Sequence, residues 1–194
     1  MNDAEPVGSG EDDLIAAAQA GSQGAMVELY HRHRGLVIGY VLRMTGDRDL
    51  ADEVFASTFA TFFTGLARYQ SRGRLGAYLL RIARSRLADE ARARSRTGRR
   101  LPNWGAEDNR ETEPIDFTLG PSEAVATSEL AGRAGMALQK LPELLREVVV
   151  LRIYEELDYA TIAAIVGAGE TTVRSRMRYA LQALRKSMDA LREP

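Results

Sequence analysis

The stretch from Leu141 to Met188 reads LPELLREVVVLRIYEELDYATIAAIVGAGETTVRSRMRYALQALRKSM, and it decides the fold. Its pattern predicts an apolar helix, a short turn, a second short helix, a glycine turn and a long helix rich in arginine. Pro142 suits the first position of a helix, where its missing N–H costs nothing. Asp158 suits the N-cap of a helix over 159–166, and Gly167 suits its end because glycine tolerates positive φ. The sequence therefore predicts a helix-turn-helix.

The last of these helices, which begins near residues 170–172, has two different faces. Val173, Met177, Ala180 and Leu184 follow one another at helical spacing, so we expect them to share a buried face. The remaining surface near the helix N-terminus carries Arg, Ser and Thr, at the place where a recognition helix meets base edges and phosphates in a major groove. An isolated basic helix is more often a solvated surface, but the helix and tight turn before it favour DNA binding. The residues expected to contact DNA are Thr171, Thr172, Arg174, Ser175, Arg176 and Arg178.

Composition excludes several classes of protein. The 194 residues suffice for one or two domains, and the absence of cysteine excludes disulfides and thiolate zinc sites. No run of about 18 apolar residues predicts a membrane span. The first 30 residues hold six acidic side chains and no Lys or Arg, which is the wrong sign for a secretory signal. We therefore expect a soluble, cytoplasmic protein.

No pattern points to catalysis or to a bound cofactor. The chain has no phosphate-binding loop, no nucleophile elbow and no Cys/His cluster, so we expect no catalytic residue, cofactor or small-molecule substrate. His31 and His33 do not form a metal-binding set, and a histidine at the edge of the core is the better interpretation of His33.

Charge is sorted along the chain even though the net charge is −1. Residues 65–100 contain 11 arginines against two acids, Asp89 and Glu90, which gives +9. Residues 101–125 contain six acids against Arg110, which gives −5. A basic block of this kind is typical of a surface that binds nucleic acid.

These changes in charge and in hydrophobic pattern divide the chain into four parts. They predict an all-α fold, with two small helical domains joined by a flexible linker. Residues 1–10 are expected to form a disordered tail. Residues 11–96 carry two apolar stripes at helical spacing, separated at Gly46 with Asp47 or Asp49 as the cap, and then a third helix from Leu75. Residues 97–122 have glycine and proline but no periodicity, which indicates an acidic linker. Residues 123–194 form the second helical domain.

The chain resembles bacterial RNA polymerase sigma factors of the sigma-70 family, in the extracytoplasmic-function (ECF) group. The first domain matches that pattern at Gly46-Asp-Arg-Asp-Leu-Ala-Asp-Glu-Val54, at Thr58-Phe59 and at Tyr78-Leu-Leu-Arg-Ile-Ala83. The second matches at Arg146-Glu147-Val148 and at Thr172-Val-Arg-Ser-Arg176. The resemblance implies a sigma region 2 domain over 11–96 and a sigma region 4 domain over 123–194.

The resemblance also implies partners and site residues. Core RNA polymerase would meet acidic residues at the start of the second long helix, namely Asp49, Asp52 and Glu53. The region 2 domain would hold the melted −10 strand through basic residues that follow phosphates and aromatic rings that stack on bases. These residues are Arg68, Tyr69, Arg72, Arg74, Arg81 and Arg84. The region 4 helix would read the −35 element as duplex, and an anti-sigma factor is a further expected partner.

Several alternatives stay open from the residues alone. Acids at a helix start are also good capping residues, so these residues have a structural interpretation as well. Tyr78 fits a core stripe better than a stacking platform. The acidic linker either enters the polymerase cleft or acts as a solvated tether. The functional alternative is a dimeric helix-turn-helix regulator that works without being a polymerase subunit.

Overall fold

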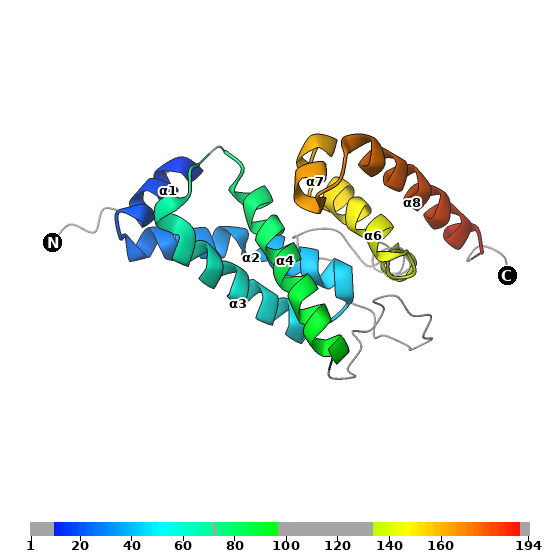
Figure 1. The fold of residues 1–194 in the computed structure, drawn as a ribbon, viewed down its shortest axis with the longest axis horizontal. Helices are drawn as coiled ribbons and strands as arrows, with labels where there is room; N and C mark the ends of the chain where they lie inside the picture. Colours follow the sequence, from blue (N-terminus) through cyan, green and yellow to red (C-terminus); the bar gives the residue numbers. More distant parts are fainter. Residues whose placement is uncertain (1–9, 72, 97–133, 191–194) are drawn as a thin grey trace, which may run out of the picture.

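The structure, a computed structural model, describes residues 10–71, 73–96 and 134–190. Over these residues it contains helices and connecting turns and no strand, which confirms the predicted all-α class. The predicted linker and most of the predicted tail lie outside the described residues, as does Arg72. Figure 1 shows an N-terminal bundle and a C-terminal unit. The bundle consists of α1 (Glu11–Gln19), α2 (Gln23–Thr45), α3 (Arg48–Gly65) and α4 (Leu75–Arg96), and the unit consists of residues 134–139, α6 (Glu143–Val149), α7 (Tyr159–Val166) and α8 (Glu170–Ala190).

The helix ends follow local side-chain chemistry. Gly46, at φ 73°, ends α2, and Asp47 rather than Asp49 caps α3 by accepting a hydrogen bond from the Leu50 amide at 2.9 Å. One prediction was wrong in detail. Pro142 lies at the N-cap and not at the first helical position, with its carbonyl accepting the first hydrogen bonds of α6. Its extended ψ of 140° places it outside the helix that it precedes.

The core of the bundle follows the predicted stripes. Aromatic rings of α3 meet those of α2 and α4, and aliphatic residues fill the space between the helices. Gly76 allows α4 to approach α2 closely, because a Cβ there would lie 3.1 Å from Leu36 Cδ2. The buried residues of the bundle include Leu29, Val37, Tyr40, Val41, Leu50, Val54, Phe55, Phe59, Phe62, Leu75, Leu79 and Leu80.

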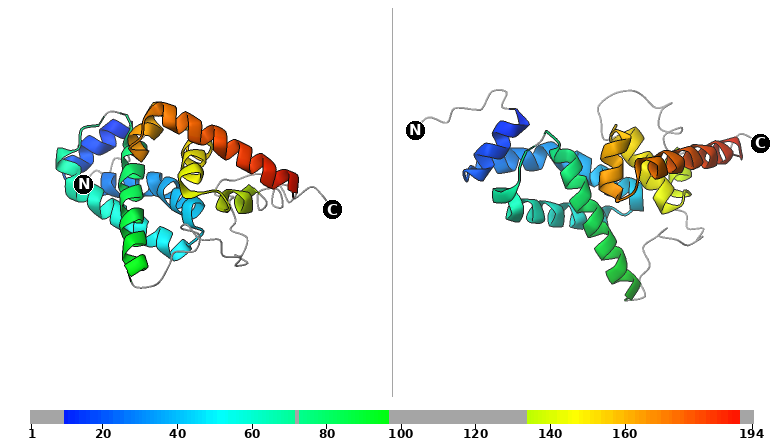
Figure 2. Two further views of the ribbon diagram at one scale, coloured as in Figure 1. Left: turned by 45° about the vertical axis from the view of Figure 1, so that its right-hand side comes forward. Right: turned by 45° about the horizontal axis from the view of Figure 1, so that its top comes forward.

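The C-terminal unit packs α6 and α7 on the buried face of α8. The end of α6 continues into a π-helical turn over Val150–Tyr154, and Glu156, at φ 53°, then redirects the chain into α7. Figures 1 and 2 show α7 beside α4, and α6 and the π turn also contact α2. The bundle and the unit therefore share one continuous apolar core.

Candidate nucleic-acid interface

The helix-turn-helix forms as its sequence predicts. Asp158 Oδ1 accepts a hydrogen bond from the Thr161 amide at 2.8 Å and so caps α7. Gly167, at φ 67°, ends α7. Three residues later α8 begins at Glu170, with Val173, Met177 and Ala180 buried against the unit. The predicted contact residues lie at the other side of α8, where Thr171, Thr172, Arg174 and Arg178 are exposed and Ser175 and Arg176 are half-buried.

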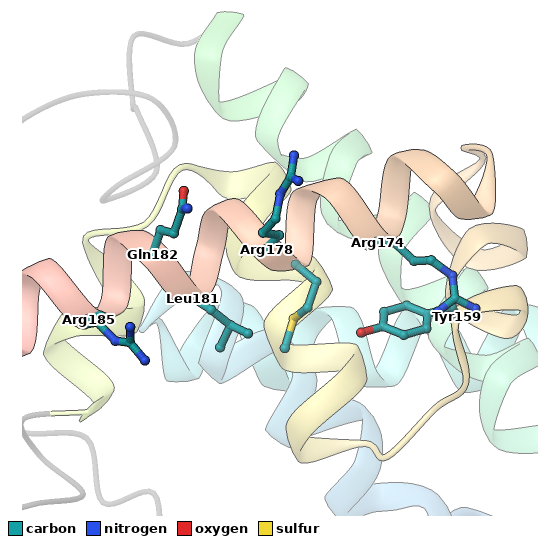
Figure 3. Close-up of a pocket in the computed structure, with 7 residues that line it drawn as sticks. Tyr159, Arg174, Arg178, Leu181, Gln182 and Arg185 are labelled. Carbon is teal, nitrogen blue, oxygen red and sulfur yellow. The ribbon is translucent and has the colours of Figure 1, made fainter.

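Arg174 makes two side-chain contacts on this surface. Its guanidinium lies over the ring of Tyr159 at 4.4 Å from the centroid and pairs with Glu170, one turn earlier on α8. Figure 3 shows this stack at one end of a groove whose other lining residues include Met177, Leu181 and Arg185. The pair with Glu170 is exposed and therefore weak. The Tyr159 stack limits the rotamers of Arg174, whose side chain is still 58% exposed.

The predicted −10 residues of the bundle fall at the junction between α3 and α4. Arg68 lies in a 3-10 turn over Leu66–Arg68, and Arg68, Arg74 and Arg81 are all exposed. Tyr69 and Tyr78 are half-buried and pack on each other, with ring centroids 4.9 Å apart. Each therefore belongs to the edge of the aromatic core and still presents part of its ring to solvent.

Helix α1 braces this junction, which the sequence did not reveal. Gln19 Nε2 donates to the carbonyl oxygens of Leu66, at 2.9 Å, and Tyr69, at 2.7 Å. Ser71 also donates to Asp12 of α1. The Leu66 carbonyl also accepts from the Tyr69 amide, so the Gln19 amide adds a second donor there and ties α1 to both ends of the 3-10 turn. The chain position of Gln19 gives no signal of this role, because its partners lie 47 and 50 residues away.

Arg84 differs from the other predicted −10 residues. Its Nε donates to Glu147 Oε1 of α6 at 2.7 Å, and its side chain is only one-third exposed. The carboxylate of the C-terminal unit therefore holds a guanidinium that the sequence assigns to DNA.

The acidic residues expected to meet polymerase are exposed on α3. Asp49 lies in the first turn, and Asp52 and Glu53 follow on the outward surface. Arg94 of α4 pairs with Glu53 at 3.1 Å, and Arg34 of α2 lies 3.9 Å from Asp52. Arg34, Asp52 and Glu53 are exposed and Arg94 is half-buried, so solvent screens the Arg34–Asp52 pair more than the Arg94–Glu53 pair.

The described parts of the chain contain no group of three or more His, Cys, Asp or Glu residues that could hold a metal ion. His33 is buried at the edge of the core, with Nε2 2.9 Å from Glu11 Oε1. Burial lowers the pKa of His33, and the neighbouring Glu11 opposes that effect. Among the described helices, none is both long and apolar enough to cross a bilayer.

Comparison with known families decides the identity. The family model of Sigma-70 region 2 matches residues 29–97, and that of Sigma-70, region 4 matches residues 137–186. The chain belongs to the sigma-70 family of RNA polymerase sigma factors. Region 2 thus falls on the bundle and region 4 on the helix-turn-helix, in the order that the sequence predicted.

Curated relatives of this sigma factor match over nearly its whole length. It is 31% identical to the ECF RNA polymerase sigma factor SigD of Mycobacterium bovis, over 92% of this chain and 84% of that one. It is 28% identical to the RNA polymerase sigma-H factor of Pseudomonas aeruginosa, over 93% and 95% of the two chains. These relatives are named as sigma factors and not as enzymes.

Solved structures share the fold. CnrH, in complex with the cytosolic domain of CnrY, covers 91% of this chain with a TM-score of 0.63 and 24% identity, and the match covers 96% of that chain. The sigma factor RpoE of Bartonella quintana, in complex with the anti-sigma factor NepR, covers 84% of this chain with a TM-score of 0.64 and 17% identity, and the match covers 95% of that chain. The family models and the curated relatives show that the protein is a promoter-specificity subunit of bacterial RNA polymerase.

Proposed function

We propose that the bundle and the C-terminal unit bind opposite ends of a promoter. Helix α8 reads the −35 element as duplex, through the exposed side chains that flank Arg174. The junction of α3 and α4 holds the melted −10 strand with its arginines and with the paired rings of Tyr69 and Tyr78. The observation that carries the proposal is α8 itself, whose polar N-terminal surface is exposed and whose opposite face is anchored in the core.

The acidic surface of α3 supports a role in binding core polymerase. Asp49, Asp52 and Glu53 are exposed and lie on the far side of α3 from its buried residues. Exposed charges of one sign steer association with a partner of the opposite sign. We infer that this surface meets a basic element of the core enzyme, within the cytoplasm.

An anti-sigma factor is a further proposed partner. The structure of the Bartonella RpoE neighbour was determined with an anti-sigma factor bound. The same fold here offers exposed apolar side chains in the C-terminal unit, including Leu144, Ile153 and Leu181, that a regulatory protein would cover.

Substitution of Arg174 tests the −35 assignment. Arg174→Ala is expected to reduce the free energy of binding to a cognate promoter by about 1–3 kcal/mol, as the loss of a bidentate base contact does, and transcription from that promoter is expected to fall accordingly. The preference for particular bases at one or two −35 positions is also expected to relax. Arg185→Ala is the matched control, because Arg185 is also exposed on α8 but lies three turns further from its N-terminus. Equal effects of the two substitutions on a set of −35 variants would contradict the assignment.

A further inference from the structure

The ring of Tyr159, on α7, lies beside two guanidinium groups. The guanidinium carbon of Arg174, on α8, lies 4.4 Å from the centroid of the ring, and that of Arg152, in the π turn, lies 5.1 Å from it. The Tyr159 ring is half-buried and packs against the apolar core. The face of an aromatic ring carries partial negative charge and attracts a cation. Tyr159 therefore holds a side chain of α8 from a different helix (Figure 3).

The turn before α7 fixes the position of Tyr159. Arg152 Nη1 donates a hydrogen bond to the carbonyl of Leu157 at 2.9 Å. Asp158 then caps α7 by accepting hydrogen bonds from the amide of Thr161, at 2.8 Å, and from its hydroxyl, at 2.9 Å. Tyr159 follows as the first residue of α7. Because hydrogen bonds hold the chain on both sides of it, the ring has a defined place from which to contact α8.

Glu170 holds the same guanidinium along one edge. Nε of Arg174 donates to Glu170 Oε1 at 3.1 Å, and Nη2 donates to the same oxygen. Both side chains are exposed, so solvent screens this pair. Glu170 also lies on α8, so the pair fixes Arg174 only relative to its own helix. The stack on Tyr159 is the contact that fixes Arg174 relative to α7.

Arg178 provides a comparison on the same helix. Its guanidinium carbon lies 5.1 Å from the centroid of the Tyr179 ring, but Tyr179 is the next residue of α8 and is 53% exposed. That contact joins two neighbouring side chains of one helix. Of the ring contacts that arginines of α8 make within the described residues, that of Arg174 is the one that joins α8 to another helix.

A fixed guanidinium favours the recognition of a base over the recognition of a phosphate. Arginine reads guanine through two hydrogen bonds to O6 and N7, which requires the guanidinium to lie in the plane of the base. A side chain that is already held in one orientation loses less conformational entropy on binding. Contacts to phosphates position the protein but carry no sequence information. Loss of the restraint on Arg174 is therefore expected to lower sequence preference.

We propose that Tyr159 is a positioning residue for base recognition, whose ring holds Arg174 in the orientation from which it reads one −35 base pair. The inference rests on the proposed function, because it takes Arg174 as a residue that reads a base. It adds a residue of α7 to the determinants of promoter specificity, and this residue acts through Arg174 without a contact of its own with a base.

Holoenzymes that contain core RNA polymerase and the full chain test the proposal, with Tyr159→Leu and Tyr159→Phe as the variants. Leucine keeps an apolar side chain at the edge of the core but removes the ring, whereas phenylalanine keeps the ring. Binding is measured to fragments of a cognate promoter that differ by one base pair at each −35 position. Tyr159→Leu is expected to reduce the preference at the position that Arg174 reads about two- to fivefold, as the loss of an exposed cation–π contact does. Tyr159→Phe is expected to retain the wild-type preference.

Two controls separate positioning from a general structural effect. Tyr154→Leu removes a ring whose centroid lies 4.5 Å from the guanidinium carbon of Arg43 on α2, so it is expected to leave the −35 preference unchanged. Tyr159→Leu introduced together with Arg174→Ala is expected to cause no further loss of preference, because Tyr159 acts through Arg174. Thermal unfolding measures whether each variant is folded, and Tyr159→Met replaces Tyr159→Leu should the leucine variant unfold.

An unchanged preference in Tyr159→Leu, when Arg174→Ala alters the preference, would overturn the inference and leave the proposed function intact. An increased preference would also overturn it, because the stack would then hold Arg174 away from the base. So would an equal loss in Tyr159→Phe, which would assign the effect to the hydroxyl. The proposed function fails in a different measurement: Arg174→Ala alone would then leave the −35 preference at the wild-type level.

Discussion

The burial of Glu155 between the two units is expected to make the stability of the fold depend on pH. This residue follows the π turn, and its side chain is 7% exposed and lies 3.4 Å from Arg43 of α2. Burial raises the pKa of Glu155 from 4.5 to about 7, although the charge of Arg43 opposes that effect. Arg43 is the charged group that faces it across the interface, and the Arg43 guanidinium also covers the ring of Tyr154.

The size and sign of the effect follow from linkage. The folded protein binds more protons than the unfolded chain between about pH 4.5 and about pH 7, so its stability falls as pH rises through this window. Each pKa unit corresponds to about 1.4 kcal/mol, which gives a total loss on the order of 3 kcal/mol. This contribution is fully present below about pH 4.5 and is lost above about pH 7. The lowered pKa of His33 acts in the opposite direction, because protonating that buried ring destabilises the fold.

Urea unfolding at about pH 5 and about pH 8 measures this term when wild type is compared with Glu155→Gln. The substitution removes the titrating group and leaves His33 in place, so the difference between the two proteins isolates Glu155. The variant is expected to lose the fall in unfolding free energy that wild type shows with rising pH, and Glu156→Gln is expected to keep it. Parallel pH profiles for wild type and Glu155→Gln would refute the reasoning.

Three further variants test the proposed DNA surfaces. Arg176→Ala is expected to weaken binding to all promoters similarly and to lower the dependence of binding on salt concentration, as the loss of a phosphate contact does. A change in sequence preference, measured on −35 variants, would contradict this expectation. Arg72→Ala combined with Arg74→Ala is expected to reduce binding to a pre-melted −10 bubble, while Arg32→Ala, an exposed control on α2, leaves it unchanged. Gln19→Ala is expected to destabilise the fold by about 1–2 kcal/mol in urea unfolding and to slow open-complex formation, and Gln19→Glu, which lacks the amide donor, is not expected to restore either.

The sequence predicted the parts of the fold that depend on neighbouring residues. The cap at Asp158, the glycine end at Gly167 and the buried face through Val173 each depend on residues within about two helical turns, so their pattern is visible in the chain. The sequence likewise limited the N-cap of α3 to Asp47 or Asp49. The hydrogen bond from the Leu50 amide shows that Asp47 is the cap.

The contacts between the units were not predictable in the same way. Arg146 and Glu147 were expected only as part of a family motif, and adjacent charged residues are normally solvated. Their partners Met44 and Tyr40 lie 102 and 107 residues away in the chain, so no local pattern records the pairing. Arg84 illustrates the consequence, since its place in a basic block indicated DNA while the fold gives it a carboxylate partner.

Reconstituted transcription tests the central claim most directly. Core RNA polymerase, genomic DNA of the source bacterium and the full chain are combined, and the 5′ ends of the transcripts are mapped. A promoter-specificity subunit is expected to produce transcripts with defined start sites that share −35 and −10 sequences and that vanish when the chain is omitted. Tight binding of a palindromic duplex by the chain alone, with no defined transcript from the mixture, would contradict the account.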